Sequence, residues 1–248
     1  MRDGARVTVA PLPPRLDVPA FERWGVRAFT TTRAAGDFNL SAADEAMREQ
    51  ARARWIALHQ ALAGVGAPRL ASALQVHGTK VLVHDTPFDG WVRIEGADGH
   101  IVIGAGAAAV TIADCVPAFI AHPSGTVGIV HAGWRGVAAG ILPQALRLFA
   151  QLGFPVDECQ VHLGPSICGR CYEVGTDVYE QLTGWETKRP RRVDLRALLA
   201  EQASQLGVAR WSASGECTKC DNGELFSHRA GDAGRQIACI YSVNSLTE

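Results

Sequence analysis

The hydrophobic positions of this chain follow two spacings, one helical and one extended. The clearest helical stripe recurs every three or four residues and consists of Met47, Ala51, Trp55, Leu58 and Leu62. Residues at that spacing share one face of an α-helix. Ser41 or Asp44 can cap the start of this helix, and Gly64 can end it. We expect the stripe to cover a β-sheet.

Other segments fit one spacing or the other. Helices are predicted over 137–152, 175–182 and 194–206. Short apolar runs predict strands over 25–31, 70–76, 80–84, 91–96, 100–103, 107–113, 116–121, 126–130, 161–164, 211–214 and 236–243. We expect a hairpin between 70–76 and 80–84, and a tight hairpin turn at 104–106. Because strands and helices do not alternate regularly, the order favours an α+β fold.

The domain organisation predicted from the sequence is simple. The chain has 248 residues, of which 47% are hydrophobic, so it can bury a sizeable core. It contains no internal repeat, low-complexity tract or clear linker. We therefore expect one domain over 1–248, with residues 1–20 as a loose N-terminal leader.

Charge and cysteine content limit the class of function. The net charge of −1 gives no electrostatic reason to expect a nucleic acid or membrane partner, and the basic stretch 188–192 is interpreted as a solvated loop. The chain shows neither an apolar run long enough to span a bilayer nor a secretory signal. Seven cysteines, an odd number, argue against a complete disulfide framework. We therefore expect a cytoplasmic protein whose thiols are reduced or bound to metal.

Three predicted strand ends carry side chains that bind metals. His77 follows the run 70–76, Cys115 follows an apolar run, and His131 follows another. Two histidines and one cysteine suit a catalytic zinc ion, which takes three protein ligands and keeps its fourth position open. Asp98 and Asp114 are candidates to orient these ligands.

The same residues allow other interpretations. Each can be an ordinary buried polar residue, or Cys115 can pair with a histidine as the nucleophile and base of a cysteine hydrolase. A blue-copper centre also uses histidine and cysteine. The only methionines are Met1 and Met47, and the eight histidines include no His-x-His pair. Multicopper chemistry, which needs more histidines at close spacing, is therefore disfavoured.

Four further cysteines form two Cys-x-x-Cys pairs. Cys168 pairs with Cys171, and Cys217 pairs with Cys220. Four thiolates make a closed structural zinc site. We expect the four to lie together, as a second zinc site or within disulfide reach. The alternative is a set of reduced buried thiols.

Several segments, in order along the chain, resemble the YfiH-type family, whose members are also called laccase-domain proteins, polyphenol oxidases or purine nucleoside phosphorylases. The segments are Phe29-Thr30-Thr31-Thr32-Arg33, Gln75-Val76-His77-Gly78, Ala113-Asp114-Cys115, His131-Ala132-Gly133-Trp134-Arg135-Gly136, 163–167, 171–175 and Phe226-Ser227-His228-Arg229. The resemblance extends from about Phe29 to the C-terminus. Of the four cysteines in the two Cys-x-x-Cys pairs, the resemblance accounts for Cys171 and Cys217 only.

The resemblance implies a four-layer α/β/β/α sandwich with mixed sheets, helices lying outside two packed sheets. It also implies a metal, usually zinc and with copper possible, on His77, Cys115 and His131, which would be the catalytic residues. The implied activity is phosphorolysis of adenosine, inosine and methylthioadenosine, with adenosine deamination at the same site. The partners would be a purine nucleoside and phosphate. The alternatives are a cysteine hydrolase or a copper-dependent polyphenol oxidase.

Five residues are expected to bind the substrate. Arg33 and Arg135 lie in glycine- or threonine-rich loops beside strand ends, and we expect them to bind phosphate or ribose. Asn39, Ser227 and His228 match loops that surround the pocket in the family the chain resembles.

Overall fold

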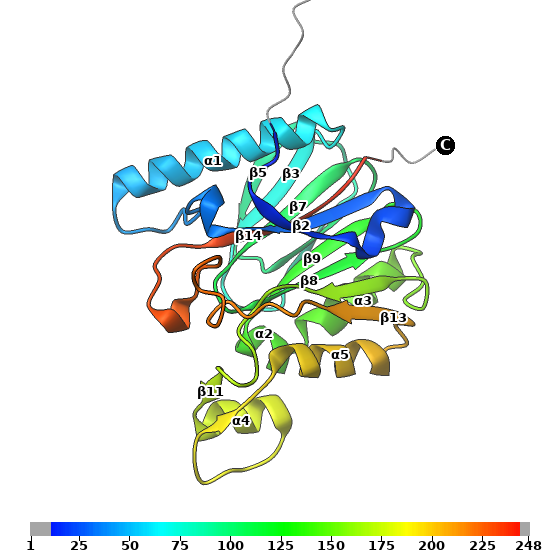
Figure 1. Cartoon of the computed structure of the whole chain (residues 1–248). Coiled ribbons are helices and arrows are strands. Elements are labelled where there is room, and N and C mark those ends of the chain that lie inside the picture. The colour runs from blue at the N-terminus through cyan, green and yellow to red at the C-terminus, as the bar shows by residue number, and fades with distance from the viewer. Residues whose placement is uncertain (1–10, 244–248) are drawn as a thin grey trace, which may run out of the picture.

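The computed structural model describes residues 11–243 and consists of two mixed six-stranded sheets packed face to face (Figure 1). In spatial order, the first sheet contains β1 (Arg15–Val18), β2 (Val26–Thr31), β14 (Gln236–Ser242), β7 (Gly106–Ile112), β3 (Arg69–Leu74) and β5 (Gly90–Glu95). The second contains β13 (Arg210–Ala213), β10 (Gln160–Leu163), β8 (Val116–Ala121), β9 (Val127–Ala132), β6 (Gly99–Val102) and β4 (Val81–His84). Most neighbouring strands are antiparallel; the parallel pairs are β7–β3, β3–β5, β13–β10 and β6–β4.

Helices cover the outer faces of both sheets. The helices are α1 (Glu45–Gly64), α2 (Trp134–Ala138), α3 (Ile141–Gln151), α4 (Thr176–Thr183) and α5 (Leu195–Gln205), with short 3-10 turns η1 (Pro19–Trp24), η2 (Arg33–Ala35) and η3 (His228–Ala230). α1 packs on the first sheet, whereas α2, α3 and α5 lie under the second (Figure 1). A third apolar cluster fills the space between the sheets. The expected α+β, four-layer α/β/β/α arrangement is confirmed.

The central strands are apolar on both faces because both faces are covered. Every residue of β8 and of β9 is buried. This burial explains the continuous apolar runs in the sequence, which lack the alternation of a strand with one wet face. The two strands pair with each other in antiparallel register, and Pro117 lies opposite His131.

The predicted stripe on α1 is confirmed except at its first position. Asp44 caps the helix, its carboxylate accepting a hydrogen bond of 2.9 Å from the Met47 N–H. Trp55 is buried and stacks on Trp91 with ring centroids 5.2 Å apart. Met47 is 42% exposed, because the helix extends past the sheet at this end.

Both expected hairpins are wrong. β3 belongs to the first sheet and β4 to the second, so residues 75–80 cross between the sheets and carry His77 with them. The turn at 104–106 likewise connects β6 of the second sheet to β7 of the first. Apolar runs specify burial but not the pairing partner, which is why adjacent strands were expected to pair.

Two other expectations need correction. Residues 15–18 form edge strand β1, paired with β2, and Val18 is buried, so this part of the expected leader is folded. Residues 1–10 lie outside the described part. The single helix expected over 137–152 is divided into α2 and α3 at Gly140, whose φ of 80° ends one helix and begins the other.

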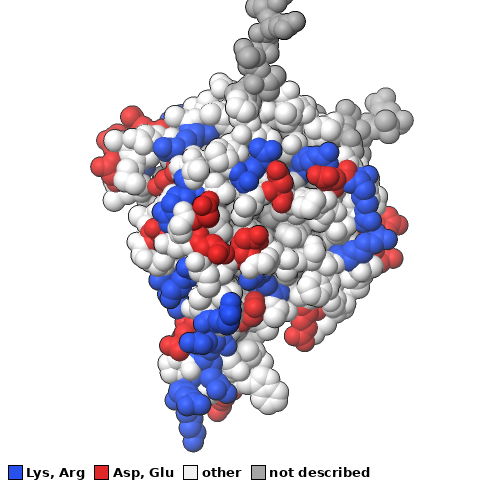
Figure 2. All heavy atoms as spheres, in the orientation of Figure 1, with Lys and Arg blue, Asp and Glu red and all other residues white. Residues whose placement is uncertain are grey.

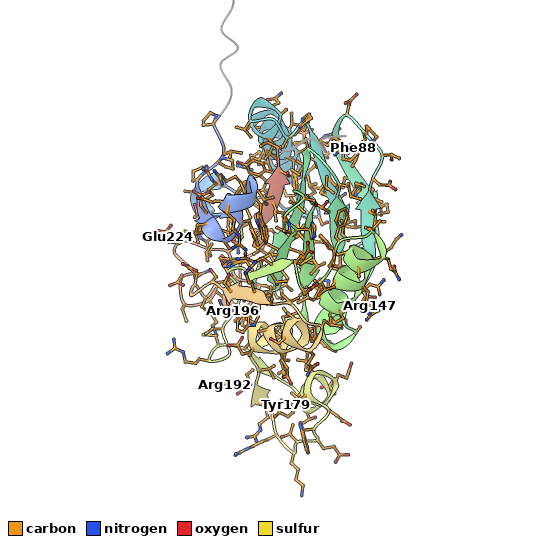
Figure 3. The ribbon with its side chains drawn as sticks, turned by 90° about the vertical axis from the view of Figure 1, so that its right-hand side faces the viewer. Phe88, Arg147, Tyr179, Arg192, Arg196 and Glu224 are labelled. Atoms are coloured by element: carbon orange, nitrogen blue, oxygen red, sulfur yellow. The ribbon has the colours of Figure 1, made fainter. Side chains whose placement is uncertain are left out.

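A small projection extends below the second sheet. It carries α4 and the two-stranded β11 (Glu173–Val174) and β12 (Arg191–Arg192), and Tyr179 and Arg192 belong to it (Figure 3). Basic side chains gather there, whereas charges of both signs are mixed over the body of this face (Figure 2). The basic stretch 188–192 is exposed. Over residues 11–243, no helix combines the length and apolar character needed to cross a membrane.

Candidate metal centre

The structure brings His77, Cys115 and His131 together from three strand ends. Their metal-binding atoms all lie within 4.8 Å of one another. His77 follows β3, Cys115 directly precedes β8, and His131 lies near the end of β9. We call this group the His-Cys cluster.

Asp98 holds two of the three ligands in place. Its fully buried carboxylate accepts hydrogen bonds from the N–H groups of Val76, His77 and Gly78 at 3.2, 2.9 and 2.7 Å. It also lies 3.0 Å from Nδ1 of His131, which leaves Nε2 of that ring for a metal. A carboxylate behind a ligating histidine fixes the ring orientation and strengthens the ligand. Asp98 therefore orients the cluster as expected.

Backbone strain and close packing are concentrated at the same place. His77 and Asp114 both have positive φ, 59° and 90°, in the region that side chains rarely adopt. A Cβ added at Gly133 would lie 2.9 Å from Cδ2 of His77 and 3.0 Å from Sγ of Cys115. Only glycine fits there, because both ligands pack against the backbone. Strain of this kind collects at functional sites.

Electrostatics prepares Cys115 as a thiolate. Burial alone would raise the pKa of this thiol, but the charge of His131 and hydrogen bonds from both histidines lower it well below its usual value. Burial alone would lower the pKa of His131, but Cys115 and Asp98 raise it. The thiolate is the form of cysteine that binds metals and attacks carbon.

Asp114 has a different role from the one expected. Its Oδ1 accepts hydrogen bonds from the hydroxyls of Thr218 and Ser227 at 2.6 and 2.7 Å, and its Oδ2 accepts one from the Arg229 N–H at 2.7 Å. The carboxylate therefore fastens two distant loops to the residue before Cys115. It supports the cavity wall and not the histidines.

The His-Cys cluster lies in the wall of a cavity of about 600 Å³, which is within the roughly 300–1,000 Å³ typical of small-molecule sites. The rest of its lining includes four aromatic side chains and four arginines: Phe38, Trp55, Trp134, Tyr172, Arg93, Arg135, Arg229 and Arg235. Arg135 stacks on Trp134 with its guanidinium carbon 4.4 Å from the ring centroid. Among residues 11–243 its guanidinium has no hydrogen-bond or ion-pair partner, so this group is available to an anion.

The five expected substrate residues are divided between two places. Asn39, Arg135 and His228 line the cavity. Arg33 does not, because its guanidinium is bound to Asp232 at 2.8 Å and to two backbone carbonyls. Ser227 is fully buried and holds Asp114.

Several lining residues were missed from the sequence. Gln75 ties the ends of β3 and β7 together by accepting from the N–H and hydroxyl of Thr111 and donating to its carbonyl. Tyr172 lies in a segment that carries the family resemblance, so that signal was present. Arg93 lies in β5, where no pattern in the sequence marks it.

Comparisons with known proteins agree with this architecture. Residues 25–242 match the family described as multi-copper polyphenol oxidoreductase laccase. The chain belongs to this family. Among solved structures, the hypothetical protein YfiH of Bacillus licheniformis has the same fold, with a TM-score of 0.80 at 20% identity over 93% of this chain and 97% of that one. The YfiH-type resemblance is therefore confirmed.

Two relatives carry names of enzymes. A purine nucleoside phosphorylase of Streptomyces coelicolor is 35% identical over 178 residues, covering 67% of this chain and 72% of the relative. Adenosine deaminase RL5, from an unknown prokaryotic organism, is 32% identical over 254 residues, covering 88% of this chain and 94% of the relative. Both names refer to reactions of purine nucleosides.

Proposed function

We propose that this protein is a zinc-dependent enzyme that phosphorolyses adenosine, inosine and methylthioadenosine and deaminates adenosine at the same site. The observation that carries the proposal is the convergence of two imidazoles and one thiol within 4.8 Å in the wall of a cavity of about 600 Å³. The names of the two relatives supply the substrate class. The reducing cytoplasm suits the thiol ligand, and we place the enzyme there.

The ligand set fits one metal ion with an open position. Three protein ligands leave a fourth site for substrate or water, and a buried carboxylate already orients one histidine. Zinc bound there would supply Lewis acidity to the substrate or to a water molecule. A multicopper cluster needs additional histidines close by, and within residues 11–243 the His-Cys cluster is the only metal-ligand group that contains histidine. We therefore favour zinc over copper.

The cavity offers groups for each part of a nucleoside and for phosphate. Arg135 would bind phosphate through two N–H groups, a geometry that a guanidinium provides and an ammonium does not. Trp134 and Tyr172 offer flat surfaces to the base. In phosphorolysis a phosphate oxygen bonds to C1′ of the ribose as the bond from C1′ to the base nitrogen breaks, and the base leaves with a proton.

A direct assay tests this proposal. Purified protein is incubated with adenosine, with and without phosphate, and the products are separated. We expect free adenine only with phosphate, inosine in both samples, and loss of both products when the cavity metal is removed by a chelator. Absence of turnover of any purine nucleoside by fully zinc-loaded protein would refute the proposal.

A second candidate is a cysteine hydrolase. Cys115, His131 and Asp98 form a nucleophile, a base and an orienting carboxylate, and the lowered pKa of Cys115 favours attack. Such an enzyme would be inactivated by iodoacetamide and indifferent to both phosphate and chelators. The two candidates therefore predict opposite responses to the same reagents.

A further inference from the structure

A second group of metal-binding side chains lies outside the cavity. The sulfur atoms of Cys168, Cys171, Cys217 and Cys220 all lie within 4.8 Å of one another, although Cys171 and Cys217 are far apart in the sequence. None of the four lines the cavity. The expectation that they lie together is confirmed, and we call them the four-cysteine cluster.

The two Cys-x-x-Cys segments adopt matching turns. The carbonyl of Cys168 accepts from the N–H of Tyr172 at 3.0 Å, and the carbonyl of Cys217 accepts from the N–H of Asp221 at 2.8 Å. In each turn, the N–H of the residue after the second cysteine donates to the carbonyl of the first cysteine. The Sγ of Cys217 accepts N–H bonds from Cys168 and Cys220 at 3.2 and 3.4 Å. Donors aimed at a sulfur stabilise its thiolate form.

The spacing of the sulfurs fits a shared ion better than a disulfide. Four sulfurs around a zinc ion at about 2.3 Å lie roughly 3.8 Å apart. The sulfurs of Cys171 and Cys220 are 3.5 Å apart, and no pair in the cluster exceeds 4.8 Å. A disulfide would need about 2.05 Å, and all four cysteines are free thiols.

Both turns rest on the start of α5. A Cβ added at Gly169 would lie 2.8 Å from Cβ of Asp194, the residue that caps this helix. Arg196, in the first turn of α5 (Figure 3), donates to the carbonyls of Ser214 and Glu216, which lead into Cys217. The two loops are therefore held side by side by contacts that need no metal, which leaves the sulfurs preorganised.

We propose that Cys168, Cys171, Cys217 and Cys220 bind one zinc ion in a closed tetrahedral site that fastens the two loops together. Four protein ligands leave no position for substrate, so this ion is structural. The fastened loops include Tyr172, which lines the cavity, and Thr218, which holds Asp114 beside Cys115. The site thus supports the cavity wall, and its existence does not depend on the proposed nucleoside activity.

Metal counting on matched variants tests the proposal. We expect two zinc ions per wild-type chain, one in Cys220→Ser, one in Cys115→Ala and none in the double variant. Cys220 is exposed, so its replacement removes no core packing. Cys220→His should keep both ions, because three cysteines and one histidine also form a structural zinc site. Cys239→Ala, a buried cysteine outside both clusters, should also keep two.

A second measurement uses cobalt in place of zinc. Cobalt-loaded wild-type protein and Cys115→Ala should both show the intense near-ultraviolet charge-transfer band of a multi-thiolate site, and Cys220→Ser should lose most of it. The proposal is overturned if Cys220→Ser retains two zinc ions, or if fresh unreduced protein contains a disulfide between Cys171 and Cys220. Iron in place of zinc at this cluster would overturn the choice of ion.

Discussion

The His-Cys cluster and the four-cysteine cluster use similar side chains but differ in how they are placed and supported. The His-Cys cluster places three ligands from three strand ends in the wall of a cavity, and a buried carboxylate supports it. The four-cysteine cluster takes two ligands from each of two loops, lies away from the cavity, and is supported by backbone N–H groups. A tetrahedral ion would have one coordination position open at the first cluster and none at the second.

This difference distinguishes the proposed reactive centre from the proposed structural site. Backbone strain occurs at His77, a member of the His-Cys cluster, and at Asp114, next to Cys115, whereas the positive φ angles of non-glycine residues 11–243 include none at the four cysteines. Strain at a site is maintained only if the surroundings enforce it. At the His-Cys cluster, the strained residues are held by hydrogen bonds: the His77 N–H donates to Asp98, and the Asp114 carboxylate accepts from Thr218 and Ser227.

The largest expected effect on turnover comes from removing a ligand of the His-Cys cluster. Cys115→Ala should lower the rate of nucleoside turnover by at least about a thousandfold. A bound metal ion stabilises the charge of the transition state by several kcal/mol, and this variant would lose that ion. The four-cysteine cluster should keep its zinc, and metal content and turnover are measured on the same preparation. Cys239→Ala serves as the matched control with normal turnover. Full activity in Cys115→Ala would show that the His-Cys cluster takes no part in catalysis.

A smaller effect is expected from the residue behind the ligands. Asp98→Asn keeps the shape of the side chain but loses its charge. We therefore expect the zinc affinity of the His-Cys cluster to fall about 10–100-fold. Affinity is measured by competition with a chromogenic chelator. The four-cysteine cluster of the same molecule is the internal control and should bind as before. Equal weakening at both clusters would indicate a general loss of folding.

Substitutions of Arg135 test whether the cavity binds phosphate beside the His-Cys cluster. Arg135→Lys should raise the Michaelis constant for phosphate by about tenfold, because losing one hydrogen bond to a charged group costs about 1.5 kcal/mol. Zinc content should not change at either cluster. Arg147→Lys, on the outer side of α3 (Figure 3), is the matched control and should behave as wild type. Normal phosphate kinetics in Arg135→Ala would exclude this role.

The sequence predicts the elements of the fold better than their connections. Apolar runs identified β8 and β9 because strands covered on both faces carry few polar residues. The same runs could not show that β3 and β4 belong to different sheets, because burial looks alike whichever strand lies alongside. Partner choice depends on contacts between residues far apart in the chain.

Candidate site residues were predictable where a local pattern marked them. His77, Cys115 and His131 each follow an apolar run, and the structure brings all three together. Arg33 had the same kind of loop context, yet Asp232, far along the chain, binds its guanidinium away from the cavity. Arg93 lines the cavity from a strand with no marking pattern. Single loop residues are placed by tertiary contacts that the sequence does not display.

The smallest expected effect tests the connection between the two clusters. Thr218 lies inside the second Cys-x-x-Cys segment and donates to Asp114, the residue before Cys115, with both side chains buried. Thr218→Val should lower the free energy of unfolding by about 1.5–3 kcal/mol, the usual cost of losing a hydrogen bond to a charged group. Both ions should stay bound, because Ser227 still donates to the same oxygen of Asp114.

Denaturant unfolding of fully zinc-loaded protein measures this effect against two controls. Thr218→Ser keeps the hydroxyl and should retain most of the stability. Thr86→Val, at an exposed position, should change the free energy of unfolding by no more than about 0.5 kcal/mol. If Thr218→Val is as stable as Thr86→Val, the hydroxyl does not couple the clusters. The four-cysteine cluster would then support the cavity through Tyr172 alone, and nucleoside binding, not stability, would report its loss.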